Sequence, residues 1–94
     1  MIYWVIYDIT DNKVRSKVAE ECKNLGLHRV QKSSFIGILS RNTAEMLYIK
    51  IGDLIDKRDC VFFIPQCNKC FADKLILGDF DERTVEAKDF IVVQ

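Results

Sequence analysis

The chain has 94 residues, 49% of them hydrophobic, and its fourteen basic residues balance its fourteen acidic residues. This length predicts a single domain over residues 1–94, and the zero net charge gives no support for nucleic-acid binding by the whole surface. No stretch approaches the roughly 20 apolar residues that a membrane-spanning helix needs, so we expect a cytoplasmic protein that uses no membrane. The four cysteines should then be mainly reduced.

The first predicted element is a strand over residues 2–8. Its first six residues are all apolar or aromatic, which is typical of a strand buried on both faces, and Asp8 stands at its C-terminal end. A carboxylate in that place can meet metal, water or substrate while the sheet holds its backbone. Asp8 is therefore a candidate metal ligand or general base, and the alternative is an ordinary cap or turn carboxylate.

A helix is predicted over residues 11–25, with Asp11 as its N-cap and Gly26 just beyond its end. Arg15 and Lys17 lie one turn into this helix. Basic groups near a carboxylate-bound metal suit the positioning of phosphate, whereas the alternative is that both are ordinary surface charges.

Residues 27–39 are predicted to be extended. The alternation of apolar and polar residues breaks at Lys32 and Ser33, which indicates a bulge or two short strands in series. Arg29 in this region is a further candidate for phosphate binding. Phe35 either stacks on a nucleic-acid base or fills the core of a dimer.

The second half of the chain is predicted to contain one helix and three short strands. Asn42 and Glu45 resemble a capping box for a helix that ends near Lys57. The remaining predicted elements are a strand over 60–64 ended by Pro65, a strand over 74–77, a polar loop over 79–88 and a strand over 90–93.

This order of elements predicts an α+β fold of the ferredoxin-like class, βαββαβ plus a C-terminal strand, arranged as a two-layer sandwich. Two helices can cover only one face of a four-stranded sheet. We therefore expect a homodimer that packs sheet to sheet, with the strand over 90–93 added to the partner's sheet edge.

Cys67 and Cys70 form a Cys-x-x-Cys pair beside Pro65. The pair supplies half of a tetrahedral zinc site, which a dimer would complete. Its surroundings lack the strand-to-helix context of thioredoxin-like redox sites. The favoured interpretation is a structural turn with two incidental thiols, and metal or redox use stays open as the alternative.

Several motifs together resemble the CRISPR-associated Cas-two family, small adaptation-stage proteins that form ferredoxin-like homodimers. The resemblance rests on Tyr7-Asp8-Ile9-Thr10-Asp11, Arg15, the segments 26–31 and 33–37, and the closing segment 89–93.

The resemblance implies a metal-dependent endonuclease acting on RNA or DNA, in which Asp8 binds Mg²⁺ or Mn²⁺ at the two-fold axis. Family positions that match Arg15, Arg29 and Phe35 are associated with activity, and Lys17 stands where many members have a second arginine. The implied partners are a second copy of the chain, the Cas-one integrase, and nucleic acid as duplex DNA or single-stranded RNA. The alternative is a non-catalytic dimer that only scaffolds the integrase.

Overall fold

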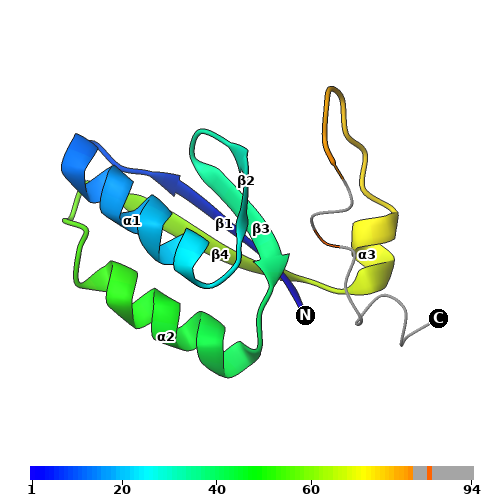
Figure 1. The fold of residues 1–94 in the computed structure, drawn as a ribbon, viewed down its shortest axis with the longest axis horizontal. Coiled ribbons are helices and arrows are strands. Elements are labelled where there is room, and N and C mark those ends of the chain that lie inside the picture. The colour runs from blue at the N-terminus through cyan, green and yellow to red at the C-terminus, as the bar shows by residue number, and fades with distance from the viewer. Residues whose placement is uncertain (82–84, 86–94) are drawn as a thin grey trace.

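The computed structural model of the protein describes residues 1–81 and 85 (Figure 1). The predicted strand over 90–93 and most of the predicted loop over 79–88 lie outside the described residues. None of the helices within the described part is both long and apolar enough to cross a membrane.

Four strands form one antiparallel sheet in the order β2-β3-β1-β4. In Figure 1, α1 and α2 run side by side over one face of this sheet, and α3 lies beyond the end of β4. The elements in chain order are β1 (Ile2–Asp8), α1 (Asn12–Asn24), β2 (His28–Gln31), β3 (Ser34–Ile38), α2 (Arg41–Gly52), β4 (Cys60–Gln66) and α3 (Asn68–Ala72).

Successive residues of β1 point to opposite faces of the sheet, so the strand contributes to two apolar clusters. Tyr3, Val5 and Tyr7 pack in the larger cluster, together with the buried residues of α1 and α2. Ile2 and Trp4 belong to a smaller cluster with Phe71 of α3. The chain therefore covers part of the second sheet face with its own C-terminal segment.

Within residues 1–81 and 85, the rest of the second face is exposed. Ile6 of β1 is 36% exposed, and Phe62 and Ile64 of β4 are 56% and 43% exposed. The expectation of a first strand buried on both faces therefore holds for Ile2 but not for Ile6.

The ends of α1 match the sequence prediction. The Asp11 carboxylate accepts hydrogen bonds from the backbone N–H groups of Lys13 and Val14, as an N-cap does. Gly26 has a φ of +82°, and the N–H groups of Gly26 and Leu27 donate back to the last turn. A glycine adopts this left-handed conformation without the steric cost that a side chain would add.

The predicted cap of α2 is wrong. The helix begins at Arg41, and its N-cap is Ser40, whose hydroxyl accepts a hydrogen bond from the N–H of Thr43. Because this hydroxyl already caps the helix, Asn42 lies inside the first turn, and Glu45 pairs with Arg41 instead. The helix also ends at Gly52, five residues before Lys57.

The predicted break between the second and third strands is a hairpin. Lys32 and Ser33 form the turn between β2 and β3, and the pairing register shifts between Arg29 and Gln31. The two strands thus pair side by side and do not run in series.

Three expectations for the second half of the chain are corrected. Pro65 does not end β4, because β4 is an edge strand, where a missing N–H costs no ladder bond. The predicted strand over 74–77 has no strand structure, and the Leu75 and Leu77 side chains are almost fully exposed. A strand-to-helix junction is present at Cys67, which directly follows β4 and caps α3.

Candidate functional site

Asp8 is the last residue of β1, where it pairs with Cys60 of β4. Its side chain is exposed, and no hydrogen bond or ion pair links it to the rest of the described chain. The neighbouring Asp59 differs, since its two carboxylate oxygens accept bonds from the N–H groups of Thr10 and Asp56, each at 3.1 Å. Asp8 is thus available for a ligand, whereas Asp59 is already engaged.

Arg15 holds the turn that follows Asp8. Its Nη1 donates to the carbonyl oxygens of Ile9 at 3.0 Å and Thr10 at 3.2 Å, and its Nη2 donates to Asn12 Oδ1. A guanidinium is suited to this task because its donors form a rigid planar fork. Arg15 therefore fixes the backbone between β1 and α1, which is the backbone that positions Asp8.

A hollow of about 520 Å³ opens beside this turn. The side chains of Arg15, Arg29 and Lys32 line it together with the Asp8 carboxylate, so that three positive charges surround one negative charge. Such a site attracts anions, and phosphate in particular matches the donors of arginine and lysine. The complete lining is Tyr7, Asp8, Ile9, Asn12, Arg15, Ser16, Arg29, Lys32 and Ser33.

Phe35 lies behind this hollow and not in it. Its side chain is fully buried in the larger cluster, with the Tyr7 ring stacked at a centroid distance of 6.3 Å and the Arg29 guanidinium 5.1 Å from its ring centre. The burial assigns Phe35 to the core, so its ring presents no free face for a nucleic-acid base. Phe35 contributes to the site by holding the Arg29 guanidinium through a cation–π contact.

Tyr7 forms the buried wall of the hollow. Burial raises the pKa of the Tyr7 hydroxyl, although the positive charge of Arg29 opposes the rise. Its hydroxyl donates to the carbonyl oxygen of Lys32 at 3.4 Å, which links β1 to the β2–β3 turn. Tyr7 thus stays a neutral hydrogen-bond donor at ordinary pH.

The structure brings together three of the five residues selected from the sequence, namely Asp8, Arg15 and Arg29. Lys17 is exposed on α1 and does not line the hollow. Asn12 and Ser16 also line the hollow but were not predicted as site residues from the sequence. Their positions could have been inferred, because Asn12 lies three residues before Arg15 and four before Ser16, and residues at these spacings share one helix face.

The donor set fits a divalent cation only in part. Within residues 1–81 and 85, no group of three or more histidine, cysteine, aspartate or glutamate side chains is placed to bind a metal. Mg²⁺, however, commonly retains several waters and uses only one or two carboxylates. The free Asp8 carboxylate fits one such ligand position.

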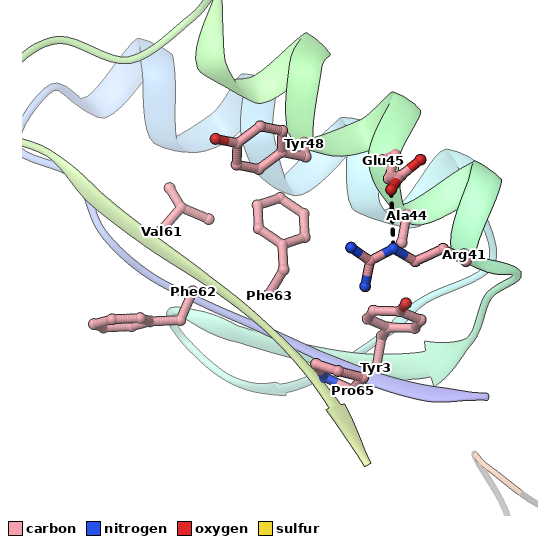
Figure 2. Close-up of a pocket in the computed structure, with 9 residues that line it drawn as sticks. All are labelled: Tyr3, Arg41, Ala44, Glu45, Tyr48, Val61, Phe62, Phe63 and Pro65. Atoms are coloured by element: carbon pink, nitrogen blue, oxygen red, sulfur yellow. Dashed lines mark hydrogen bonds and ion pairs between the residues drawn. The ribbon is translucent and has the colours of Figure 1, made fainter. Parts of the chain in front are cut away.

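A second hollow, of about 370 Å³, lies between α2 and β4 (Figure 2). Figure 2 shows Tyr3, Phe63 and Pro65 on the sheet side and Tyr48 on the helix side. Arg41 Nε and Glu45 Oε2 form an ion pair at 2.9 Å. Its acidic side chain, Glu45, is already engaged, and most of its lining is aromatic or apolar. The hollow at Asp8 is therefore the stronger candidate for phosphate chemistry.

Comparison with known proteins gives consistent results. The family model described as CRISPR associated protein Cas2 matches residues 1–74. An Archaeoglobus fulgidus protein named CRISPR-associated endoribonuclease Cas2 1 is 36% identical over 89 residues, covering 94% of this chain and 95% of that protein. A Korarchaeum cryptofilum protein named CRISPR-associated endoribonuclease Cas2 is 56% identical over 66 residues, covering 69% and 71% of the two chains.

The fold is similar to that of Streptococcus pyogenes Cas2, with a TM-score of 0.71 and 24% identity over 83% of this chain and 100% of the other. A Thermoproteus tenax protein named as a fusion of endonuclease Cas1 and endonuclease Cas2 is 51% identical over 35 residues, which are 37% of this chain and 13% of that protein. The family match over most of the sequence, together with the close full-length relative, shows that this chain belongs to the CRISPR-associated Cas2 family.

Proposed function

We propose that this chain is a divalent-metal-dependent endonuclease that hydrolyses phosphodiester bonds of RNA or DNA, with Asp8 as its metal ligand. The observation that carries the proposal is the Asp8 carboxylate, which has no side-chain partner among the described residues and lies in a hollow lined by Arg15, Arg29 and Lys32. The names of the Archaeoglobus and Korarchaeum relatives, both endoribonucleases, make single-stranded RNA the first substrate to test.

Each side chain of the hollow has a separate task in this proposal. Arg29 and Lys32 bind phosphate oxygens, the first by a planar fork and the second as a point charge. Asp8 holds Mg²⁺ or Mn²⁺, and its orientation is fixed by the β1 ladder and by the turn that Arg15 secures. When bound, such a cation lowers the pKa of water and stabilises negative charge on the phosphoryl group.

We further infer a ferredoxin-like homodimer that packs through the open part of the sheet. The alternation along β1 places Asp8 on the same face as Ile6, whose side chain is exposed there with Phe62 and Ile64. A two-fold axis through this face would bring two Asp8 carboxylates toward one groove. This arrangement doubles the carboxylates available for a cation.

The test is the variant Asp8→Asn, which keeps the size of the side chain and removes its charge. We expect cleavage of labelled single-stranded RNA and duplex DNA in Mg²⁺ or Mn²⁺ to fall at least about a hundredfold, because a lost metal contact is worth several kcal/mol. Wild-type cleavage should also stop with EDTA.

The matched control is Asp53→Asn, which alters an exposed carboxylate that directly follows α2 and does not line the hollow, so it should leave cleavage unchanged. Metal-dependent cleavage that survives in Asp8→Asn would remove Asp8 from the proposed site.

A second candidate function is a non-catalytic dimer that holds duplex DNA and scaffolds the Cas1 integrase. The open apolar face and the name of the Thermoproteus fusion protein favour it. This function predicts that Asp8→Asn still assembles with Cas1 and still supports spacer capture. Loss of cleavage with intact spacer capture would mean that the scaffold is the function that matters for adaptation.

A further inference from the structure

Cys67 and Cys70 lie at the junction where β4 passes into α3. Cys67 directly follows the last residue of β4, and its Sγ accepts a hydrogen bond from the backbone N–H of Cys70 at 3.3 Å. Both thiols are exposed to solvent. The strand-to-helix context is therefore present, although the sequence had not indicated it. Cys70 also lies in contact with Cys67.

The two thiols have unequal acidity. The N–H of Cys70, followed by the Cys70 thiol, lowers the pKa of Cys67. The contact with Cys67 raises the pKa of Cys70. Cys67 is thus the better thiolate donor, while Cys70 keeps its proton, which is the division between an attacking and a resolving cysteine.

The other two cysteines lack these features. Cys22 is fully buried in the larger cluster, and burial raises its pKa to about 12, so its thiol is inert at neutral pH. Cys60 is exposed but lies at the opposite end of β4, beside Asp8. Paired thiol chemistry in this chain is therefore confined to the β4–α3 junction.

We propose that Cys67 and Cys70 form a thiol–disulfide exchange site whose substrates are low-molecular-weight disulfides. This site is separate from the hollow at Asp8. The Cys67 thiolate attacks one sulfur of the disulfide, forms a mixed disulfide and releases one thiolate, which takes a proton. Cys70 then loses its proton and attacks Cys67 Sγ, which closes the Cys67–Cys70 bond and releases the second thiol. The protein dithiol is oxidised by two electrons, and the small disulfide is reduced to two thiols.

The position of the pair links it to the sheet. Phe71 follows Cys70 directly and is buried against Ile2 and Ile36 on the second sheet face. β4 pairs with β1 from Asp8–Cys60 at one end to Ile2–Gln66 at the other, so the thiols lie at the far end from Asp8. The thiol pair therefore adjoins the segment that covers the second sheet face and lies away from the hollow at Asp8.

The experiment titrates the Cys60→Ser protein with mixtures of reduced and oxidised glutathione, followed by acid quenching, alkylation and intact-mass measurement. We expect two thiols to disappear together, with a dependence on the square of reduced glutathione over oxidised glutathione, because the protein disulfide releases both glutathione molecules. Peptide mapping of oxidised wild-type protein should recover Cys67 joined to Cys70.

Two further variants separate the roles of the cysteines. Cys60→Ser/Cys70→Ser should stop at a mixed disulfide with one glutathione, because the resolving thiol is gone. Cys60→Ser/Cys67→Ser should react at least about tenfold more slowly at pH 7, since the more acidic thiol is lost.

Different results would overturn the proposal. Loss of a single thiol, or a dependence on the first power of reduced glutathione, would mean simple adduct formation. Stoichiometric zinc on freshly purified protein, lost in Cys67→Ser and protecting the thiols from alkylation, would identify a metal site instead. Because these experiments measure thiol oxidation and not cleavage, failure of the thiol–disulfide exchange proposal is distinguishable from failure of the nuclease proposal.

Discussion

Cys22 makes stability depend on pH in the alkaline range. Its thiol is fully buried, and burial raises its pKa from 9.0 to about 12. Between these values the unfolded chain has lost the thiol proton while the folded chain retains it, so the free energy of unfolding falls as pH rises. We expect the wild-type protein to lose roughly 2 kcal/mol more than Cys22→Ala between about pH 8.5 and 10.5.

Urea unfolding at several pH values measures this difference. Cys22→Ala serves as the reference because it removes the titrating group and retains all the lysines and tyrosines that also titrate. Its own stability at neutral pH should be lower by about 1 kcal/mol, owing to the small cavity it creates. Parallel pH profiles for the two proteins would show that Cys22 does not titrate in this way.

At the scale of single residues, the sequence predicted the parts of the site but not their assembly. Asp8 was found because it ends an apolar run, and Asp11 and Gly26 because cap signals are local. The meeting of Arg29 with Asp8 depends on the β2–β3 hairpin and its register shift between Arg29 and Gln31, which no local pattern fixes. The same limit applies to Phe35, which is buried in the larger cluster beside Tyr7.

Among the elements, β3 leaves too little room for a side chain at Gly37 without a shift of Leu27. A Cβ placed there would lie 2.5 Å from Leu27 Cδ2 and 3.2 Å from Leu27 Cα, just beyond the end of α1. Since Leu27 is buried in the larger cluster, relief of this clash requires its side chain to repack and its backbone to shift slightly. We expect Gly37→Ala to lower the free energy of unfolding by about 1–3 kcal/mol, measured by urea denaturation.

Gly52→Ala is the matched control. A Cβ at Gly52, the last residue of α2, meets no atom within 4 Å, so this change should be neutral or stabilising by up to about 1 kcal/mol. The double variant Leu27→Ala/Gly37→Ala should be less destabilised than the sum of its single variants, because the smaller side chain removes the nearer contact. Full additivity would place the cause of the Gly37 effect elsewhere.

Element by element, the errors of prediction have specific physical origins. Ser40 and Asn42 are both good cap residues two positions apart, and the sequence does not say which one the preceding strand brings into place. Leu75–Leu77 has the apolar composition of a strand but lies beyond α3 without a strand beside it among the described residues. α3 itself spans five residues, too few for a helical period to be seen.

On the scale of the whole molecule, the two faces of the sheet have different coverings. α1 and α2 bury one face, whereas on the other the described residues Phe71, Phe80 and Val85 cover the part around Ile2 and Ile36. The sequence predicted this asymmetry because the apolar residues of β1 and β4 exceed what two helices can cover. It did not predict that the chain itself would cover part of the second face.

Phe62 provides the test of the proposed dimer. Figure 2 shows Val61 and Phe63 pointing toward α2 and Phe62 pointing away from it, and Phe62 is 56% exposed in the single chain. A lysine there would bury a charge against apolar side chains if two sheets pack face to face, and such a charge is costly without a partner. We expect wild-type protein to sediment as a dimer and Phe62→Lys as a folded monomer.

The matched control for this prediction is Ile49→Lys, which places the same charge on the outer face of α2, where Ile49 is 63% exposed. It should leave the dimer intact, because α2 lies on the other side of the sheet from the open face. A monomeric wild-type protein, or a dimer that only Ile49→Lys dissociates, would exclude packing through the sheet. The groove shared by two Asp8 carboxylates would then be excluded as well, because that groove requires the two open faces to meet.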